Sequence, residues 1–361
     1  MTSLYKSKEL QLILQQELGG NKARITLLSY LIISVLKVRS VNFKRLATGY
    51  DNGVLLSSKL RRVQRFFSQF TFAEALYCKL IMKTLPIEGK YELSLDRTNW
   101  KLGQLNINIL FLSVIYKGVG LPVFWCTLGN KRGNSSQKER KDLLNRFMLN
   151  FGDDKIAYLT ADREFVGQDW LAYLTNHQIR YFIRVRNNMH ITLAEGKTVK
   201  AYWLLMAQRL NRVYFHPKIV YLNDTLGYFS GIKYVGQNGK IDYLILVSYN
   251  QEDLSLDIYK NRWQIETMFR AFKSAGFNLE DTHITDYERL DTLIKVISIA
   301  FVWSYSVGIY LNDCVKKIAI KNHGRRAVSF FTYGLDFLTN AFINTIRNDI
   351  KIAFKIFLSC T

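Results

Sequence analysis

Four polar residues in the stretch 254–274 have the types and the spacing to do chemistry. At ~100° per residue, a helix would place them within an arc of roughly 60°: Tyr259, Arg262, Glu266 and Lys273. The Glu266 carboxylate would lie between two cations, and carboxylates supply the oxygen ligands that hard ions such as Mg²⁺ need. An apolar stripe beside the arc would bury the helix: Leu254, Ile258, Ile265, Met268, Phe269 and Phe272. Ordinary surface ion pairing is the alternative, because Arg262 and Glu266 at i, i+4 contribute only ~0.2–0.5 kcal/mol.

Two further carboxylates follow predicted strands. Residues 91–96 alternate apolar and polar side chains and end at Asp96, and the strand predicted for 155–161 ends just before Asp162. A lone Asp at such a position often caps a turn instead. Two other acidic sets stay open for the middle position: Asp153 with Asp154, which we rank lower because they fall in a predicted loop, and Glu164.

The spacing Tyr259-x2-Arg262-x3-Glu266-x6-Lys273 resembles the third motif of cut-and-paste bacterial transposases of the insertion-sequence-four type. This family carries an Asp-Asp-Glu catalytic triad. Two further matches lie upstream in the family's order: Asp96-Arg97-Thr98-Asn99-Trp100 and Asp162-Arg163-Glu164-Phe165. The likeness extends over residues 40 to 311.

The resemblance implies that Asp96, Asp162 and Glu266 are catalytic and hold two Mg²⁺ ions, with Asp96 bridging both; Mn²⁺ would substitute. Two such ions suit in-line displacement at a phosphodiester, one activating the attacking oxygen and the other stabilising the leaving oxygen. Without metal, converging carboxylates repel one another. Three side chains would contact DNA phosphates near the cleaved bond: Tyr259, Arg262 and Lys273. The rest of the motifs would support the site, although packing explains Trp100 equally well.

The activity that the resemblance implies is metal-dependent excision and strand transfer of an insertion sequence, through hairpin ends. The partners would be double-stranded DNA, namely the terminal inverted repeats and the target, and a second copy of the chain in a homodimeric synaptic complex. Two alternatives remain: a catalytically inactive, transposase-derived DNA-binding protein, and a general ribonuclease-H-like nuclease.

The elements around these residues predict an α/β fold. Strands are expected at 91–96, 106–116, 121–128, 155–161 and 180–185, and helices at 136–151 and 168–177. Three antiparallel strands followed by alternating helix and strand is the order of a ribonuclease-H-like domain. Residues 187–250 are rich in β-branched and aromatic residues, which predicts a β insertion. Trp203 in this segment is a candidate for DNA binding by base stacking, with a core position as the alternative.

Three domains are expected: a helical DNA-binding domain at 1–88, the catalytic domain at 89–275 and a helical C-terminal region at 276–361. Residues 1–90 contain 15 Lys and Arg against 5 Asp and Glu. Arg61, Arg62 and Arg65 cluster on one predicted helix and are candidate phosphate contacts, although a solvated basic face is the alternative. The C-terminal region is expected to pack against protein and not against DNA.

Composition agrees with a polyanionic partner, because 50 Lys and Arg against 29 Asp and Glu give a net charge of +21. The four cysteines are scattered and the five histidines show no ligand spacing, which argues against a disulfide framework or a zinc site. The apolar run 296–311 is short for a membrane span and is expected to be a buried helix. We therefore expect a protein of the bacterial cytoplasm, associated with the nucleoid, without a membrane partner.

Overall fold

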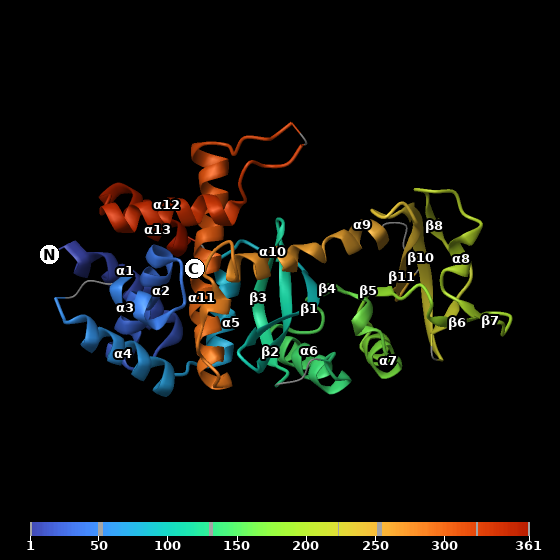
Figure 1. Cartoon of the computed structure of the whole chain (residues 1–361), viewed down its shortest axis with the longest axis horizontal. Helices are drawn as coiled ribbons and strands as arrows, with labels where there is room; N and C mark the ends of the chain where they lie inside the picture. Colours follow the sequence, from blue (N-terminus) through green and yellow to red (C-terminus); the bar gives the residue numbers. More distant parts are fainter. Residues whose placement is uncertain are drawn as a thin grey trace. The chain divides into compact units, whose positions relative to one another are not determined.

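The computed structural model describes residues 2–49, 53–129, 133–222, 224–250, 255–322 and 324–359. Its helices and strands are labelled in Figure 1. Contacts between residues divide the chain into two compact units. The first comprises Met1–Ile87, Lys101–Leu105 and Met268–Thr361, and the second comprises Glu88–Trp100 and Asn106–Thr267.

Five helices form the N-terminal part of the first unit, where the sequence pattern predicts mainly helix. They are α1 (Thr2–Leu18), α2 (Lys22–Val38), α3 (Phe43–Gly49), α4 (Leu56–Gln69) and α5 (Glu74–Lys83). The Asn21 side chain caps α2 by accepting bonds from the N–H groups of Ala23 and Arg24. Three apolar residues bury one side of α4, namely Val63, Phe66 and Phe67.

The C-terminal helices of the same unit are α11 (Tyr287–Tyr310), the π-helical turn η3 (Leu311–Val315), α12 (Phe330–Asn344) and α13 (Arg347–Ser359). Both α2 and α12 pack against α11. Within the described residues, Tyr287–Val315 is long and apolar enough to cross a membrane, and 94% of its most apolar window is buried. The pair Lys22–Val38 and Phe43–Gly49 passes the same test only if the two helices, bent by 100°, are counted as one span. The burial of Tyr287–Val315 confirms the prediction of a buried helix at 296–311.

A single large sheet of eleven strands is the framework of the second unit. Its order is β3-β2-β1-β4-β5-β11-β10-β9-β6-β7, and β8 also pairs with β10. The strands are β1 (Tyr91–Leu102), β2 (Leu105–Tyr116), β3 (Val119–Thr127), β4 (Ile156–Ala161), β5 (Tyr181–Val185), β6 (His190–Leu193), β7 (Thr198–Lys200), β8 (Val213–Phe215), β9 (Val220–Leu222), β10 (Thr225–Val235) and β11 (Ile241–Ser248). Because β11 pairs antiparallel with β5, the predicted β-rich segment 187–250 continues this sheet.

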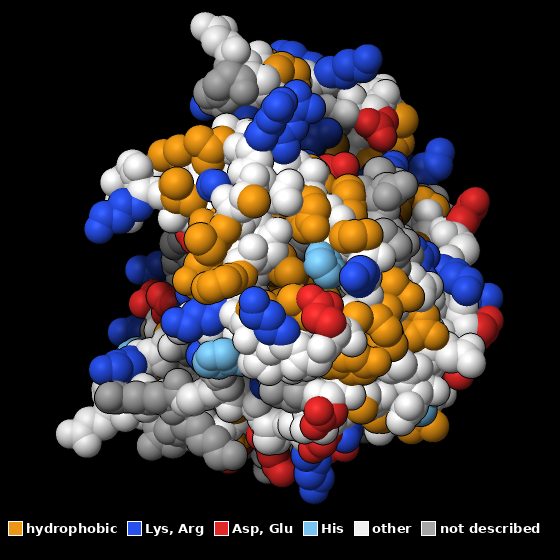
Figure 2. Space-filling model, turned by 90° about the vertical axis from the view of Figure 1, so that its right-hand side faces the viewer, with side chains coloured by type: hydrophobic (Ala, Val, Ile, Leu, Met, Phe, Trp, Pro, Cys, Tyr) orange, Lys and Arg blue, Asp and Glu red, His pale blue; other side chains and the backbone are white. Residues whose placement is uncertain are grey.

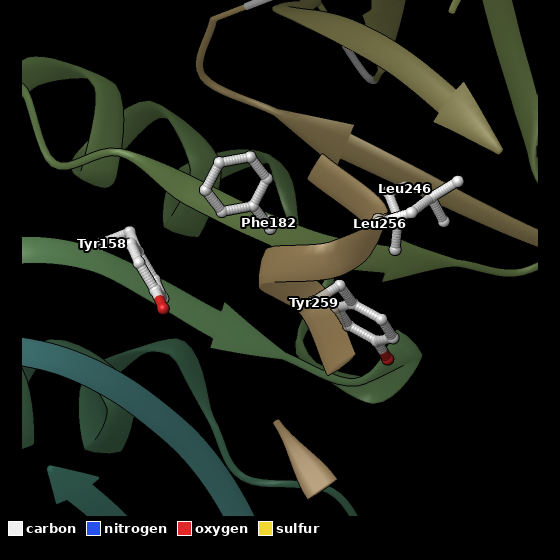
Figure 3. Packing of buried hydrophobic residues seen from close by; sticks show 5 residues of the cluster. All are labelled: Tyr158, Phe182, Leu246, Leu256 and Tyr259. Carbon is white, nitrogen blue, oxygen red and sulfur yellow. The ribbon is translucent and has the colours of Figure 1, made fainter. Parts of the chain in front are cut away.

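Helices cover both faces of this sheet (Figure 1). α6 (Gln137–Phe151) and α7 (Gln168–Asn176) lie on one side, and the short helix α9 (Ser255–Lys260) lies on the other. Figure 3 shows how α9 is held: Leu256 and Tyr259 pack with Tyr158 of β4, Phe182 of β5 and Leu246 of β11. Three strands therefore fix the position of Tyr259, the first residue of the Tyr-Arg-Glu-Lys spacing.

Candidate active site

Asp96 and Asp162 lie at the same level on neighbouring parallel strands. The pairing of β1 with β4 ends with Leu95 opposite Ala161, so the two aspartates follow side by side. Neighbouring strands lie about 4.8 Å apart, which brings the two carboxylates together. The strand predicted to end at Asp96 in fact continues to Leu102, because β1 also neighbours β2 in the sheet.

The alternative acidic residues are placed differently. Asp153 and Asp154 precede β4, so they lie at the opposite end of that strand from Asp162, and both are exposed. Glu164 lies closer, and its Oε1 is 2.6 Å from Nε of Arg97.

The single helix predicted for 254–274 is wrong. The structure has two helices, α9 and α10 (Trp263–Phe272), separated by a turn at Asn261 and Arg262. Leu254, where the helix was expected to begin, lies outside the described residues. The backbone N–H of Arg262 donates to the carbonyl of Tyr259 at 3.0 Å, so the turn is tighter than an α-helix.

Side-chain bonds to the sheet hold this turn in place. Nδ2 of Asn261 donates to Oε2 of Glu92 on β1 at 3.2 Å and to the hydroxyl of Tyr158 on β4 at 3.0 Å. These partners are 169 and 103 residues away along the chain. The helical periodicity of the sequence therefore contained no sign of the break.

Arg262 joins two of the predicted triad residues. Its Nη1 lies 2.8 Å from Oδ2 of Asp96, and its Nη2 lies 3.0 Å from Oε1 of Glu266. Only 5% of the Arg262 side chain is exposed, so its pairing with Glu266 is not the ordinary surface ion pair that was the alternative. A buried guanidinium that forms two ion pairs holds Asp96 and Glu266 in fixed positions.

Asp162 has partners of its own. The hydroxyl of Tyr259 donates to Oδ1 of Asp162 at 3.3 Å. Nη1 of Arg184, on β5, lies 4.0 Å from the same oxygen. Tyr259 is also buried. Each triad carboxylate thus contacts a cation or a hydroxyl group: Asp96 and Glu266 contact Arg262, and Asp162 contacts Tyr259.

Electrostatics distinguish Asp96 from an ordinary surface carboxylate. Burial raises its pKa to about 6, with Glu164 and Asp162 adding to the rise, while Arg262 and the backbone N–H of Arg97 act against it. Burial also opposes the charge of Arg262, but Tyr259 and the surrounding carboxylates outweigh burial and raise the pKa of Arg262. The site therefore carries a buried excess of negative charge, which a cation would relieve.

The donor atoms suit a hard divalent cation, because Asp96, Asp162 and Glu266 offer only oxygen ligands. Their arrangement in this structure is that of an ion-paired site: within the described residues, no group of three or more His, Cys, Asp or Glu side chains is gathered to hold a metal. Arg262 supplies the positive charge between Asp96 and Glu266. Arg262 bonds one oxygen of each carboxylate, Oδ2 of Asp96 and Oε1 of Glu266, and so balances part of the charge that a metal would otherwise balance.

The remaining predicted residues lie on other elements. Lys273 belongs to the first unit, where its Nζ lies 2.8 Å from Oε1 of Glu280. Arg61, Arg62 and Arg65 are exposed on α4. Trp203 begins α8 (Trp203–Met206) and is 52% exposed, which excludes a core position.

Two side chains near the triad lie outside the predicted site residues. Arg184 is a charged residue within an otherwise apolar strand, a pattern that signals a buried partner. Trp263 follows the motif arginine and is 58% exposed, with the Arg262 guanidinium 4.9 Å from its ring centroid. This exposed tryptophan packs its flat apolar ring beside the guanidinium that joins Asp96 and Glu266.

Fold and site together define a mixed α/β protein whose sheet and helices bring acidic side chains together with arginines. A family model described as "Transposase DDE domain" matches residues 90–303, which is more than half of the chain. The chain belongs to this transposase family, whose members are DNA-cleaving and strand-transferring enzymes.

Among solved structures, the chain is similar to one described as "Cryo-EM structure of piggyBac transposase synaptic complex with hairpin DNA". The TM-score is 0.44 and the sequence identity 11%, over 99% of this chain and 81% of that one. No protein with a curated description matches the sequence.

Proposed function

We propose that this transposase excises and inserts an insertion sequence by a cut-and-paste mechanism, with Asp96, Asp162 and Glu266 as its catalytic triad. One observation carries the proposal: Arg262 bonds both Asp96 and Glu266, which lie 170 residues apart in the chain. The strand register adds Asp162 beside Asp96. The resemblance to the insertion-sequence-four type implies such a meeting of one acid from each motif, whereas Lys273 of the third motif pairs with Glu280 instead.

The strand order supports a ribonuclease-H-like assignment for the catalytic domain. β3, β2 and β1 neighbour one another, and β4 and β5 continue the sheet in parallel with β1. In this arrangement the first strand and the fourth carry the two aspartates, and a later helix carries Glu266. The bounds 1–88, 89–275 and 276–361 for the three domains stay predictions.

Two divalent ions, Mg²⁺ in the cell, would supply activation of the attacking oxygen and stabilisation of the leaving oxygen when held by the triad. Arg262, released from one carboxylate, would turn its free N–H groups to a DNA phosphate. The hydroxyl of Tyr259 would donate along the same path, and Lys273 would contact a phosphate near the cleaved bond. We also propose that the excised DNA ends form hairpins.

DNA is positioned, in this proposal, by basic and aromatic side chains outside the triad. Arg62 and Arg65 line one groove of about 530 Å³ with Arg24 of α2, on an apolar floor that includes Phe66 and Phe70. Such a groove suits a phosphate backbone. Figure 2 looks onto the end of the second unit that carries the β-rich segment, where hydrophobic and basic side chains are interspersed.

Trp203, exposed in that β-rich segment, is proposed to stack on a base. Two chains are proposed to act together on a pair of element ends, in the cytoplasm of a bacterial cell.

The test is cleavage of DNA that carries the terminal inverted repeats found beside the gene. With Mg²⁺, we expect cutting at the repeat ends by the wild type and loss of cutting in Asp96→Asn, Asp162→Asn and Glu266→Gln. Asp153→Asn is the matched control, because it removes an exposed acid at the other end of β4. Undiminished cutting by Glu266→Gln would remove the triad from the mechanism.

The same experiment separates the two alternatives. Binding of the repeats without nicking in Mg²⁺ or Mn²⁺ would identify a catalytically inactive derivative. Equal cutting of unrelated duplexes would identify a general nuclease.

A further inference from the structure

The segment 316–329, between η3 and α12, carries a concentrated positive charge that the catalytic proposal does not use. Five basic residues fall within it, Lys316, Lys317, Lys321, Arg325 and Arg326, and no acidic residue occurs between Asp313 and Asp336. All five are exposed. In Figure 1 this segment is the orange loop that extends from the end of α11 before the chain enters α12.

Backbone bonds fold the segment into a short two-stranded ribbon. Ile320 forms an antiparallel bridge with Arg326. On one side of the bridge, the N–H of Lys321 donates to the carbonyl of Arg325 at 2.8 Å. On the other side, the N–H of Ala327 donates to the carbonyl of Ala319 at 2.8 Å. This register pairs 321 with 325 and 319 with 327.

The ribbon is fastened to the helices of its own unit at two points, Ile318 and Arg326, while Ile320 stays 61% exposed. Ile318 is 9% exposed, and its N–H donates to Oδ1 of Asn312 at 3.0 Å. Across the ribbon, the Arg326 guanidinium lies 4.2 Å from the centroid of the Phe330 ring. Both Ile318 and Arg326 belong to the face that includes position 320, because side chains alternate along a strand and paired residues share a face.

The opposite face therefore carries Lys317, Lys321 and Arg325 outward. Extended backbone rises about 3.3 Å per residue, so Lys317 and Lys321 stand about 13 Å apart along one edge. The result is a narrow, anchored ribbon with cations on its outer face and no carboxylate of its own.

We propose that this basic ribbon, residues 316–322 and 324–327, binds the sugar-phosphate backbone of double-stranded DNA. The major groove of DNA is wide enough to admit a two-stranded ribbon, and cations on its outer face would meet phosphates at the groove edges. The proposal rests on the proposed function for its ligand. It departs from the expectation that the C-terminal region packs only against protein.

The test compares two double variants of equal charge from the same unit. Lys317→Gln with Lys321→Gln removes two cations from the ribbon, and Lys351→Gln with Lys355→Gln removes two exposed cations from α13. Fluorescence anisotropy of a labelled duplex gives the binding constant of the full chain at salt concentrations from 50 to 200 mM. Thermal melting of each variant checks that the unit is folded.

Each phosphate contact contributes about 0.9 to the slope of log affinity against log salt. We expect the ribbon variant to lose about 1.8 of that slope, so that its affinity falls about tenfold less than that of the wild type across this salt range. The α13 variant should keep the wild-type slope.

An unchanged slope in the ribbon variant, with tight binding by the wild type, would overturn the ribbon proposal alone. A wild type that binds no duplex would instead overturn the proposed function. The ribbon assignment would also fall if the ribbon variant lost binding to vesicles of anionic lipid, or to RNA, while its DNA binding matched the control.

Discussion

Replacing Arg262 with Gln should destabilise the second unit and make it dependent on divalent cations. The guanidinium is almost fully buried and is the shared partner of Asp96 and Glu266. Removing one member of a buried ion pair costs about 3–5 kcal/mol, because the other charge is left without compensation. The Asp96 side chain is 14% exposed, and that of Glu266 is 37% exposed.

Solvent screens the exposed partner, so the Glu266 pair contributes little. The loss is therefore set by Asp96, and we expect about 3 kcal/mol. For a unit of this size, that corresponds to a fall in melting temperature of about 6–12 °C. Arg163→Gln is the matched control, since Arg163 is an exposed neighbour in the second motif and surface changes stay within about 0.5 kcal/mol.

Thermal unfolding in EDTA and in Mg²⁺ tests the cause of the loss. If the carboxylates of Asp96 and Glu266 lack a counter-charge, Mg²⁺ should stabilise Arg262→Gln more than it stabilises the wild type, because a ligand of the folded state stabilises it by mass action. A melting temperature equal to that of Arg163→Gln would show that the buried ion pairs do not hold the site. An equal Mg²⁺ effect on wild type and Arg262→Gln would show that arginine and metal do not compete.

Two further predictions concern packing and thiol reactivity. Gly308→Ala should lower the urea midpoint by an amount equivalent to about 1–3 kcal/mol of stability, the usual cost of overpacking, because its Cβ would stand only 1.8 Å from the carbonyl oxygen of Phe330. Gly133→Ala is the control, since its Cβ would meet nothing within 4 Å. Equal midpoints for the two variants would contradict the close packing of α11 on α12. Burial raises the pKa of the Cys126 thiol to about 12. At mildly alkaline pH this thiol should therefore stay protonated and be alkylated slowly, while the exposed Cys314 reacts first. Equal alkylation rates for the two cysteines, measured by peptide mass spectrometry, would contradict this prediction.

Much of the candidate site could be predicted from the sequence because its information is local. The alternating pattern of 91–96 and the apolar run 155–161 predict two strands. Asp96 ends the first pattern, and Asp162 follows the second. The Tyr259, Arg262 and Glu266 spacing is local as well. Motif spacing therefore led to the residues that the strand register and Arg262 bring together.

Long-range bonds decided what the sequence could not show. The break between α9 and α10 depends on Asn261 reaching Glu92 and Tyr158, and no helical periodicity encodes those partners. The pairing of β11 with β5 joins strands separated by residues 186–240, so local patterns could not place β11 inside the sheet. The burial of Arg262 follows from both features.

The sequence also showed the positive charge of 316–326 without its arrangement. Only the pairing of Ile320 with Arg326 reveals which basic side chains share a face. Helix-period reasoning about the C-terminal region had assigned this segment no role. The pairing register of this ribbon depends on its turn and on contacts with α12, and composition alone does not give it.

The central claim is that Asp96, Asp162 and Glu266 jointly hold divalent cations on bound DNA. Its most direct test counts Mn²⁺ ions by electron paramagnetic resonance in the complex of the chain with an uncut repeat end. We predict about two ions per wild-type chain, loss of both in Asp96→Asn, and loss of one in Asp162→Asn and in Glu266→Gln. Wild-type Mn²⁺ binding in all three variants would contradict the account.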